Sequence, residues 1–166
     1  MALPLMKPDM DIAKSSRHSK IAGDFGEALV LYWLSKYGFE CARVDHTGID
    51  LIARRPRAND VLGISVKTRT RSTGAEKMFV KIPADDFDKM ENACAAFGCT
   101  PYVAVVVDAG AVIRAFITSL THFLQLFPRT KSGSGWRMSG KHLARYAKDP
   151  EVVMFEMHAE TKRWWF

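Results

Sequence analysis

Two short segments of the chain carry the residue types that phosphodiester chemistry requires. Residues 48–51 read Gly-Ile-Asp-Leu and residues 64–67 read Ile-Ser-Val-Lys, so each places a hydrophilic side chain inside a strand-like apolar run. If the two segments pair as a hairpin, Asp50 and Lys67 lie on the same face, because side chains alternate along a strand. A carboxylate can hold a metal ion and an ammonium can neutralise a phosphate, so the pattern favours metal-assisted hydrolysis.

Two further groups can complete such a site. Glu27 lies on a predicted upstream helix and offers a second carboxylate, and the backbone carbonyl of Val66 offers another oxygen ligand. Hard cations such as Mg²⁺ or Mn²⁺ take oxygen ligands of these kinds. Two structural alternatives stay open at this point. Asp50 and Lys67 can form an ion pair without chemistry, and Glu27 can point to solvent or pair with a basic neighbour.

The hydrophobic pattern predicts which elements position these residues. A stripe at helical spacing from Ile21 to Tyr32 predicts a first helix, capped by one of Ser15, Ser16 or Ser19 and stopped by Gly38. Turn formers at 55–60 and at 109–110 predict two hairpins. The full expectation is helices over 20–37, 84–97, 119–127 and 140–147, and strands over 39–45, 49–54, 61–67, 78–82, 101–108, 111–118 and 152–158.

The bulk composition is that of an ordinary globular protein. The chain has 166 residues, of which 48% are apolar and 25% charged, enough for one domain with appendages. Its longest apolar runs fall short of the roughly 20 residues that span a bilayer, so no membrane segment is expected. The first 20 residues lack the apolar stretch of a secretory signal. Three cysteines without metal-type spacing indicate thiols in a reducing compartment, which predicts a cytoplasmic protein.

Positive charge is concentrated late in the chain. The net charge is +6, and residues 129–148 contain six Lys or Arg residues and no Asp or Glu. Such a block suits a polyanion, because each cation placed on a phosphate releases counterions. We therefore expect nucleic acid to contact Arg137, Lys141 and Arg145. Arg69 and Arg71, which follow Lys67, can meet backbone phosphates too. The alternative for both groups is an ordinary solvated surface.

The order and spacing of these pieces resemble a known superfamily. Gly26-Glu27 on a first helix, 48–52 (Gly-Ile-Asp-Leu-Ile) and 64–68 (Ile-Ser-Val-Lys-Thr) are similar to the restriction-endonuclease-like superfamily with the PD-(D/E)xK motif, and most to its Holliday junction resolvase-like branch. The resemblance covers residues 20–108. It implies an α/β fold with a mixed central β-sheet flanked by helices, in the order α-β-β-β-α-β, and a divalent-metal-dependent nuclease that acts on DNA.

Carried over to this chain, the motif assigns roles and exposes one departure. Asp50 would ligate the metal, Glu27 would assist directly or through water, and Lys67 would orient the nucleophile or neutralise the transition state. Ser65 stands where the motif has its second acid. In some members of the superfamily the following helix supplies that carboxylate, and the candidates here are Glu76, Asp85, Asp86 and Glu91. The alternative is a catalytically degenerate domain that binds nucleic acid or a protein partner without cleaving.

The same reading divides the chain into three parts. We expect a flexible segment at 1–18, a nuclease-like core at 19–127 and a basic extension at 128–166 that packs on the core. The terminal sequence Arg163-Trp164-Trp165-Phe166 is unusual for a solvated tail. Its aromatic rings can stack on bases or dock, either onto the core or onto a second copy of the chain in a homodimer.

Overall fold

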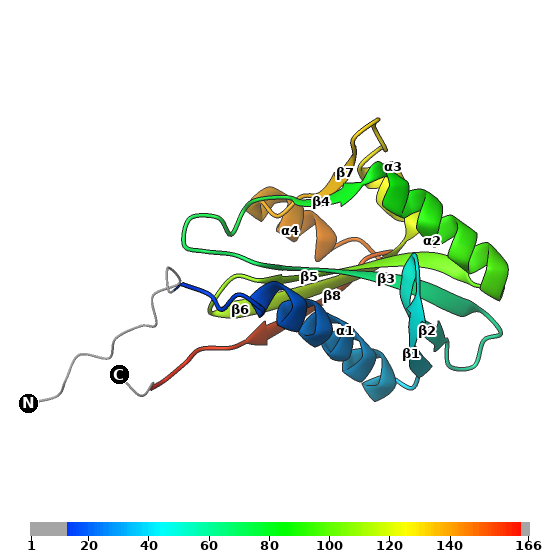
Figure 1. The fold of residues 1–166 in the computed structure, drawn as a ribbon, viewed down its shortest axis with the longest axis horizontal. Helices are drawn as coiled ribbons and strands as arrows, with labels where there is room; N and C mark the ends of the chain where they lie inside the picture. The colour runs from blue at the N-terminus through cyan, green and yellow to red at the C-terminus, as the bar shows by residue number, and fades with distance from the viewer. Residues whose placement is uncertain (1–12, 164–166) are drawn as a thin grey trace, which may run out of the picture.

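A twisted six-stranded sheet forms the centre of the molecule (Figure 1). The computed structural model describes residues 13–163, so residues 1–12 of the expected flexible segment and the last three aromatic residues lie outside the described part. The sheet has the strand order β1-β2-β3-β5-β6-β8. Its strands are β1 (Glu40–His46), β2 (Ile49–Arg54), β3 (Val61–Thr70), β5 (Thr100–Asp108), β6 (Val112–Ser119) and β8 (Val153–His158).

Strand pairing in this sheet is mixed, as the sequence predicts. Strands β1, β2 and β3 form an antiparallel meander, and β5, β6 and β8 pair antiparallel as well. The two halves join through the parallel pairing of β3 with β5. Parallel neighbours require a crossover connection. Here the crossover consists of β4 (Val80–Pro83) and helix α2 (Ala84–Phe97).

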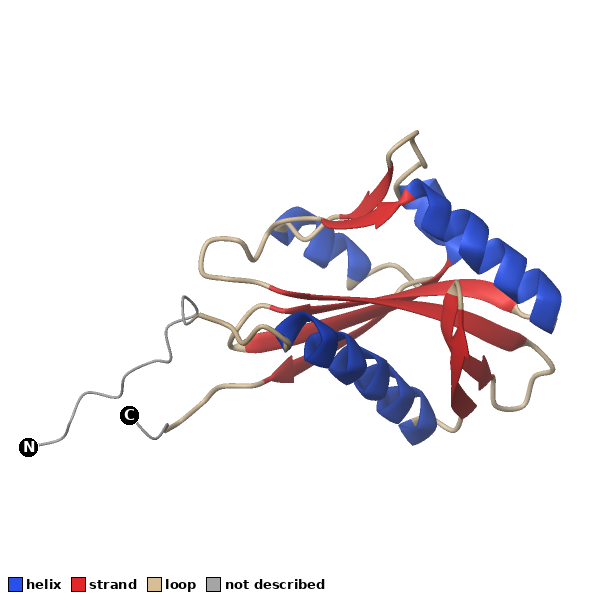
Figure 2. Ribbon diagram, in the orientation of Figure 1, coloured by secondary structure: helices blue, strands red, loops and turns tan. Residues whose placement is uncertain are grey.

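The helices cover both faces of the sheet unequally (Figure 2). Helix α1 (His18–Lys36) packs against one face through Leu29, Val30 and Trp33, over the apolar side of β2, β3 and β5. The opposite face carries α2, α3 (Leu120–Leu126), α4 (Gly140–Tyr146) and a small second sheet. That sheet pairs β4 antiparallel with β7 (Gly133–Trp136). We call these two sides the α1 face and the α2 face.

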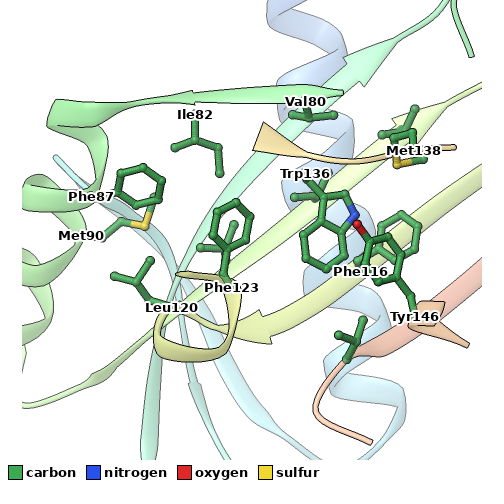
Figure 3. Packing of buried hydrophobic residues seen from close by; sticks show 14 residues of the cluster. Val80, Ile82, Phe87, Met90, Phe116, Leu120, Phe123, Trp136, Met138 and Tyr146 are labelled. Carbon is green, nitrogen blue, oxygen red and sulfur yellow. The ribbon is translucent and has the colours of Figure 1, made fainter. Parts of the chain in front are cut away.

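Aromatic side chains pack together with aliphatic ones in the core of the α2 face (Figure 3). Trp136 of β7 is fully buried and stacks on Tyr146 of α4, with ring centroids 4.2 Å apart. It also stacks on Phe123 of α3 at 5.6 Å. Offset and tilted ring pairs of this kind add stabilisation beyond the apolar area that they bury. Trp136 thus ties the small sheet to the main one, so that residues 133–158 contribute a strand to each sheet.

Most elements lie where the hydrophobic pattern predicts them, with three differences. Helix α1 begins at His18 behind Arg17, which makes no side-chain capping bond, so the predicted serine cap is not formed. Strand β3 continues to Thr70, and β7 arises in a segment expected to be a loop. By contrast, Ser119 caps α3 through a bond from the His122 N–H at 3.1 Å. In the described part of the chain, every helix is too short or too polar to cross a membrane.

Candidate active site

Asp50 lies where strands β2 and β3 separate. The register between them runs from Arg54 opposite Val61 to Leu51 opposite Ile64, and β3 then continues without β2 beside it. Just past this point the Asp50 carboxylate accepts a hydrogen bond from the Val66 N–H at 2.6 Å. The side chain therefore takes the place of the next backbone partner and is held at the opening between the two strands.

The carbonyl of Val66 lies at the same opening. In a strand, the N–H and C=O of one residue point to the same edge. Because the Val66 N–H bonds to Asp50, the Val66 carbonyl also points to the side that β2 has left. The predicted oxygen ligand thus lies on the edge that faces Asp50.

Asp50 and Lys67 share the α2 face, as predicted from strand alternation. Leu51, next to Asp50, packs into the apolar cluster under α1, so Asp50 points the other way. Lys67 pairs in register with Val105, which belongs to the cluster on the α2 face. Burial raises the pKa of Asp50, and the Lys67 ammonium opposes this rise, as a positive charge on the same face would.

Helix α2 brings a second carboxylate to this point. Asp86, in its first turn, forms an ion pair with Lys67, with 2.7 Å between Oδ2 and Nζ. Both side chains are largely buried, with 21% of Lys67 and 22% of Asp86 exposed. The helix lies close to the β1–β2 turn because Gly48, at φ 104°, has no side chain there. A Cβ on Gly48 would overlap the Lys89 carbonyl of α2.

The electrostatics of the site leave negative charge only partly compensated. Burial raises the pKa of the Asp50 carboxyl above its ordinary value of 3.8, and the Asp86 carboxylate acts in the same direction. The Val66 N–H, the Lys67 ammonium and the Ser65 side chain oppose this rise without cancelling it. The Lys89 ammonium also lies 3.7 Å from Asp86, and it pairs with Asp85 at 2.6 Å. The carboxylates of Asp50, Asp85 and Asp86 therefore share two ammonium groups, an arrangement that a bound cation would stabilise.

Ser65 occupies the motif position directly beside these groups. It is 3% exposed and lies on the α2 face, two residues before Lys67 along β3. A serine hydroxyl can donate to a carboxylate but brings no charge of its own. Of the four acids that the sequence offers as substitutes, the structure brings Asp86 to the site.

The other three acids lie in different surroundings. Asp85 is exposed and pairs with Lys89 of the next helical turn at 2.6 Å. Glu76 lies in the loop between β3 and β4, and Glu91 is an exposed residue of α2. The sequence contained no signal that singled out Asp86, because its role depends on how α2 is rotated over the sheet.

Glu27 lies on the other side of the sheet, in α1. Its carboxylate accepts a hydrogen bond from Arg43 of β1 at 2.8 Å, and 28% of the side chain is exposed. Arg43 also donates to the Asp24 carbonyl of α1. In this structure the Glu27 carboxylate forms an ion pair that fastens α1 to β1, one residue after Gly26, which packs closely against Thr68 beside Lys67.

The predicted cations for nucleic-acid binding fall into two groups. Arg137, Lys141 and Arg145 are exposed around α4, and all three lower the pKa of His142, which places their charges close together. Arg69 is exposed and donates to the Thr68 carbonyl. Arg71 is partly buried and donates to the Phe79 carbonyl at 3.1 Å, and its pKa is lowered by burial and by Arg69.

The donor set at Asp50 fits a hard divalent cation in chemistry. Two carboxylates, from β2 and α2, and the Val66 carbonyl supply oxygen ligands of the type that Mg²⁺ and Mn²⁺ take. The raised pKa of Asp50 indicates that this carboxylate lacks full charge compensation. Within residues 13–163, three or more His, Cys, Asp or Glu side chains nowhere form a cluster suited to a metal ion. Any cation here would therefore rely on water or substrate oxygens for its remaining ligands.

Comparison with known proteins shows similarity at the level of the fold. No protein-family model matches the sequence, and no curated protein matches it. Among solved structures, the chain is similar to Hjc, a Holliday junction resolvase from Archaeoglobus fulgidus, with 24% identity and a TM-score of 0.52 over 69% of this chain and 83% of that one. A bacterial homing endonuclease has 13% identity and a TM-score of 0.48, over 73% of this chain and 78% of that one. The chain therefore has an α/β fold of the restriction-endonuclease-like type, with a mixed six-stranded sheet.

Proposed function

We propose that this protein is a divalent-metal-dependent nuclease that hydrolyses phosphodiester bonds in DNA. One observation carries the proposal. Asp50, Lys67 and Asp86 come together on the α2 face at the opening between β2 and β3, where burial keeps the pKa of the Asp50 carboxyl raised despite the nearby Lys67 ammonium. Buried charges that are incompletely compensated are costly to folding, and they are typical of functional sites.

The chain's own groups have distinct roles in this proposal. Asp50, Asp86 and the Val66 carbonyl would hold Mg²⁺ or Mn²⁺, which supplies charge neutralisation at the phosphate and a more acidic water. Lys67 provides a fixed positive charge for the negative charge that develops on the phosphate oxygens. The ion pair with Asp86 holds the Lys67 ammonium at the site before substrate arrives. Asp86 thereby takes the part of the acid that is missing at Ser65.

Glu27 has a subordinate part in the same proposal. Its ion pair with Arg43 is partly exposed, and such pairs contribute little to stability, so the carboxylate can exchange partners at small cost. We propose that Glu27 assists through water when DNA is bound. Arg137, Lys141 and Arg145 would contact phosphates along the duplex, with Arg69 nearer to the site.

Cleavage of a circular plasmid tests the proposal directly. Activity should require Mg²⁺ or Mn²⁺, disappear with a chelator, and fall by about 100-fold or more in Asp50→Ala and in Lys67→Ala. Without metal, Asp50→Ala should bind DNA at least as tightly as the parent, because a carboxylate that repels phosphate is gone. Cleavage that needs no metal, or that persists in Asp50→Ala, would refute this mechanism.

A non-catalytic DNA-binding domain is the second candidate, and Ser65 is the observation that favours it. The position is buried and uncharged, so the site holds fewer acids than the motif provides. This candidate predicts DNA binding by Arg137, Lys141 and Arg145 with no cleavage in any divalent cation. Replacing the three together should then weaken binding and reduce its dependence on salt. DNA binding without cleavage in Mg²⁺, Mn²⁺ and Ca²⁺ would support this second candidate over the nuclease.

A further inference from the structure

The small sheet presents an outer face that the proposed site does not use. In the β4–β7 register, Val80 pairs with Trp136 and Lys81 pairs with Gly135. Val80 and Trp136 are fully buried against the main sheet, so Lys81 and Gly135 face outward. Phe79 and Arg137 flank the buried pair and belong to the same outer face.

Phe79 is an aromatic ring held at the surface without burial. It is 45% exposed, and the Arg137 guanidinium lies 5.2 Å from its ring centroid. Gly135 makes room for the ring, since a Cβ at that position would come within 2.5 Å of a Phe79 ring carbon. A glycine inside a strand commonly marks a place of close approach. The Phe79 ring therefore lies against Gly135 of the small sheet, with the Arg137 guanidinium over it and nearly half of the residue exposed to solvent.

A cleft of about 350 Å³ runs beside this ring. Its lining includes the cations Lys81 and Arg137, the rings Phe79 and Phe127, and hydroxyls such as those of Ser132 and Ser134. Neither Asp nor Glu is among the described residues that line it. A half-exposed ring with the Arg137 guanidinium over it and Lys81 in the same groove, with no acid lining it, is complementary to a base attached to phosphates, because a guanidinium can stack on a base or pair with a phosphate.

We propose that this cleft binds an unpaired nucleotide of a DNA strand. The base lies against Phe79, and the flanking phosphates contact Lys81 and Arg137. Bases in a duplex already stack on neighbouring bases. A single exposed ring therefore binds a nucleotide whose base is unpaired and unstacked. The inference rests on the proposed nuclease function and names its substrate class, which is DNA with an unpaired segment next to the point of cleavage.

The chain connection places this cleft beside the proposed site. Strand β4, which carries Lys81, runs directly into α2, whose first turn carries Asp86. Arg71, which follows the strand bearing Lys67, donates to the carbonyl of Phe79. Two short links of the protein chain therefore join the part of the small sheet that would bind the DNA strand to the groups proposed to act on the phosphate.

Fluorescence anisotropy with a labelled single-stranded oligonucleotide, compared with a blunt duplex of the same sequence, tests the inference in the presence of a chelator. Phe79→Ala should weaken single-strand binding by about 10-fold, the effect of losing one stacked base, and leave duplex binding within about twofold. Gly135→Ala should do the same without changing any charge, because its methyl group displaces the ring. Gly140→Ala is the matched control, since a Cβ there meets nothing within 4 Å.

The outcomes separate this inference from the proposed function. Unchanged single-strand affinity in Phe79→Ala would overturn it, and so would an equal loss for both oligonucleotides, which would indicate a general surface effect. If Gly135→Ala fails to fold, as judged by circular dichroism, the exposed Phe79→Ala decides alone. If the protein binds the single strand through Phe79 but never cleaves DNA, the binding inference stands and the proposed nuclease function is refuted.

Discussion

Two clusters on the α2 side of the sheet set a cation among carboxylates, yet they differ in charge compensation. At the proposed site, Lys67 serves Asp86 and Asp50, and the pKa of Asp50 remains raised. At the base of α3, His122 contacts Asp149 at 2.9 Å and Glu151 at 3.2 Å.

His122 and Asp149 of the second cluster each favour the charged form. Burial would lower the pKa of His122, but hydrogen bonds to Asp149 and Gln125 raise it above 6.5. Burial would raise the pKa of Asp149, but the bond from His122 lowers it below 3.8. The histidine cluster is therefore a satisfied clamp between α3 and the segment before β8, whereas burial outweighs the groups that stabilise the Asp50 carboxylate and leaves its pKa raised. The difference indicates which cluster awaits a ligand.

The largest effect should come from removing the second acid of the proposed site. Asp86→Asn should lower cleavage by about 100-fold or more, because a metal-holding carboxylate is lost. The free energy of unfolding should change by less than about 1 kcal/mol, because the Asn amide oxygen can still accept a hydrogen bond from Lys67 and the repulsion between Asp50 and Asp86 disappears. Asp85→Asn is the matched control one residue away, and its cleavage should stay within about twofold. Equal losses in both variants would contradict the assignment of Asp86.

Adding a third acid should sharpen the same contrast. Ser65→Glu places a carboxylate at a buried position that already has more negative than positive charge, so we expect a loss of about 2 kcal/mol in unfolding free energy by urea denaturation. Cleavage should be equal or lower, because Asp86 already fills that role. Ser65→Ala tests the loss of the hydroxyl alone. Higher metal affinity with new cleavage in Ser65→Glu would show instead that the native site is degenerate.

Removing His122 should lower stability and leave cleavage unchanged, the reverse of the result expected for Asp86→Asn. His122→Gln removes a charge-assisted bond to Asp149 and should cost about 1.5 kcal/mol of unfolding free energy at pH 6. Specific cleavage activity should remain within about twofold of the parent at a temperature where both proteins are folded. A loss of activity without a loss of stability would mean that the two clusters are coupled.

The smallest effect is the pH dependence of the clamp. Because the pKa of folded His122 is raised, its contribution is fully present below the ordinary value of 6.5 and is lost as pH rises through the folded value. The pKa of Asp149 is lowered, so the stabilisation from its carboxylate is present above pH 3.8 and is lost as pH falls through the folded pKa. The stability difference between the parent and His122→Gln should therefore shrink by about 1 kcal/mol from about pH 5.5 to about pH 8.5. A constant difference would show that protonation of His122 is not involved.

Sequence reasoning reached the groups on paired strands more easily than those on helices. Strand alternation and the hairpin at 55–60 suffice to put Asp50 and Lys67 on one face, because both features are local. The selection of Asp86 among four acids depends on the packing of α2, which no local pattern encodes. Glu27 was placed by the motif alone, and its pairing with Arg43 follows from how α1 crosses β1.

Strand β7 shows why a local prediction fails when tertiary pairing dominates. Its sequence, Gly-Ser-Gly-Trp, has a low preference for extended structure, so residues 133–136 were expected to be a loop. Pairing with β4 and complete burial of Trp136 override that preference. Composition predicts a basic group in the residues beyond it, whereas the packing of Arg137 over Phe79 depends on the fold.

The parallel pairing of β3 with β5 has a consequence for the order of folding. The β1–β2–β3 meander joins neighbours in the chain, so the strand ends that carry Asp50 and Lys67 can meet early. Asp86 arrives only when the crossover closes a long loop and β5 docks beside β3. During synthesis, the first half of the domain would therefore carry one acid and one base without the second acid. Under the proposed function, a nascent chain gains the capacity to cut DNA only when its sheet is complete.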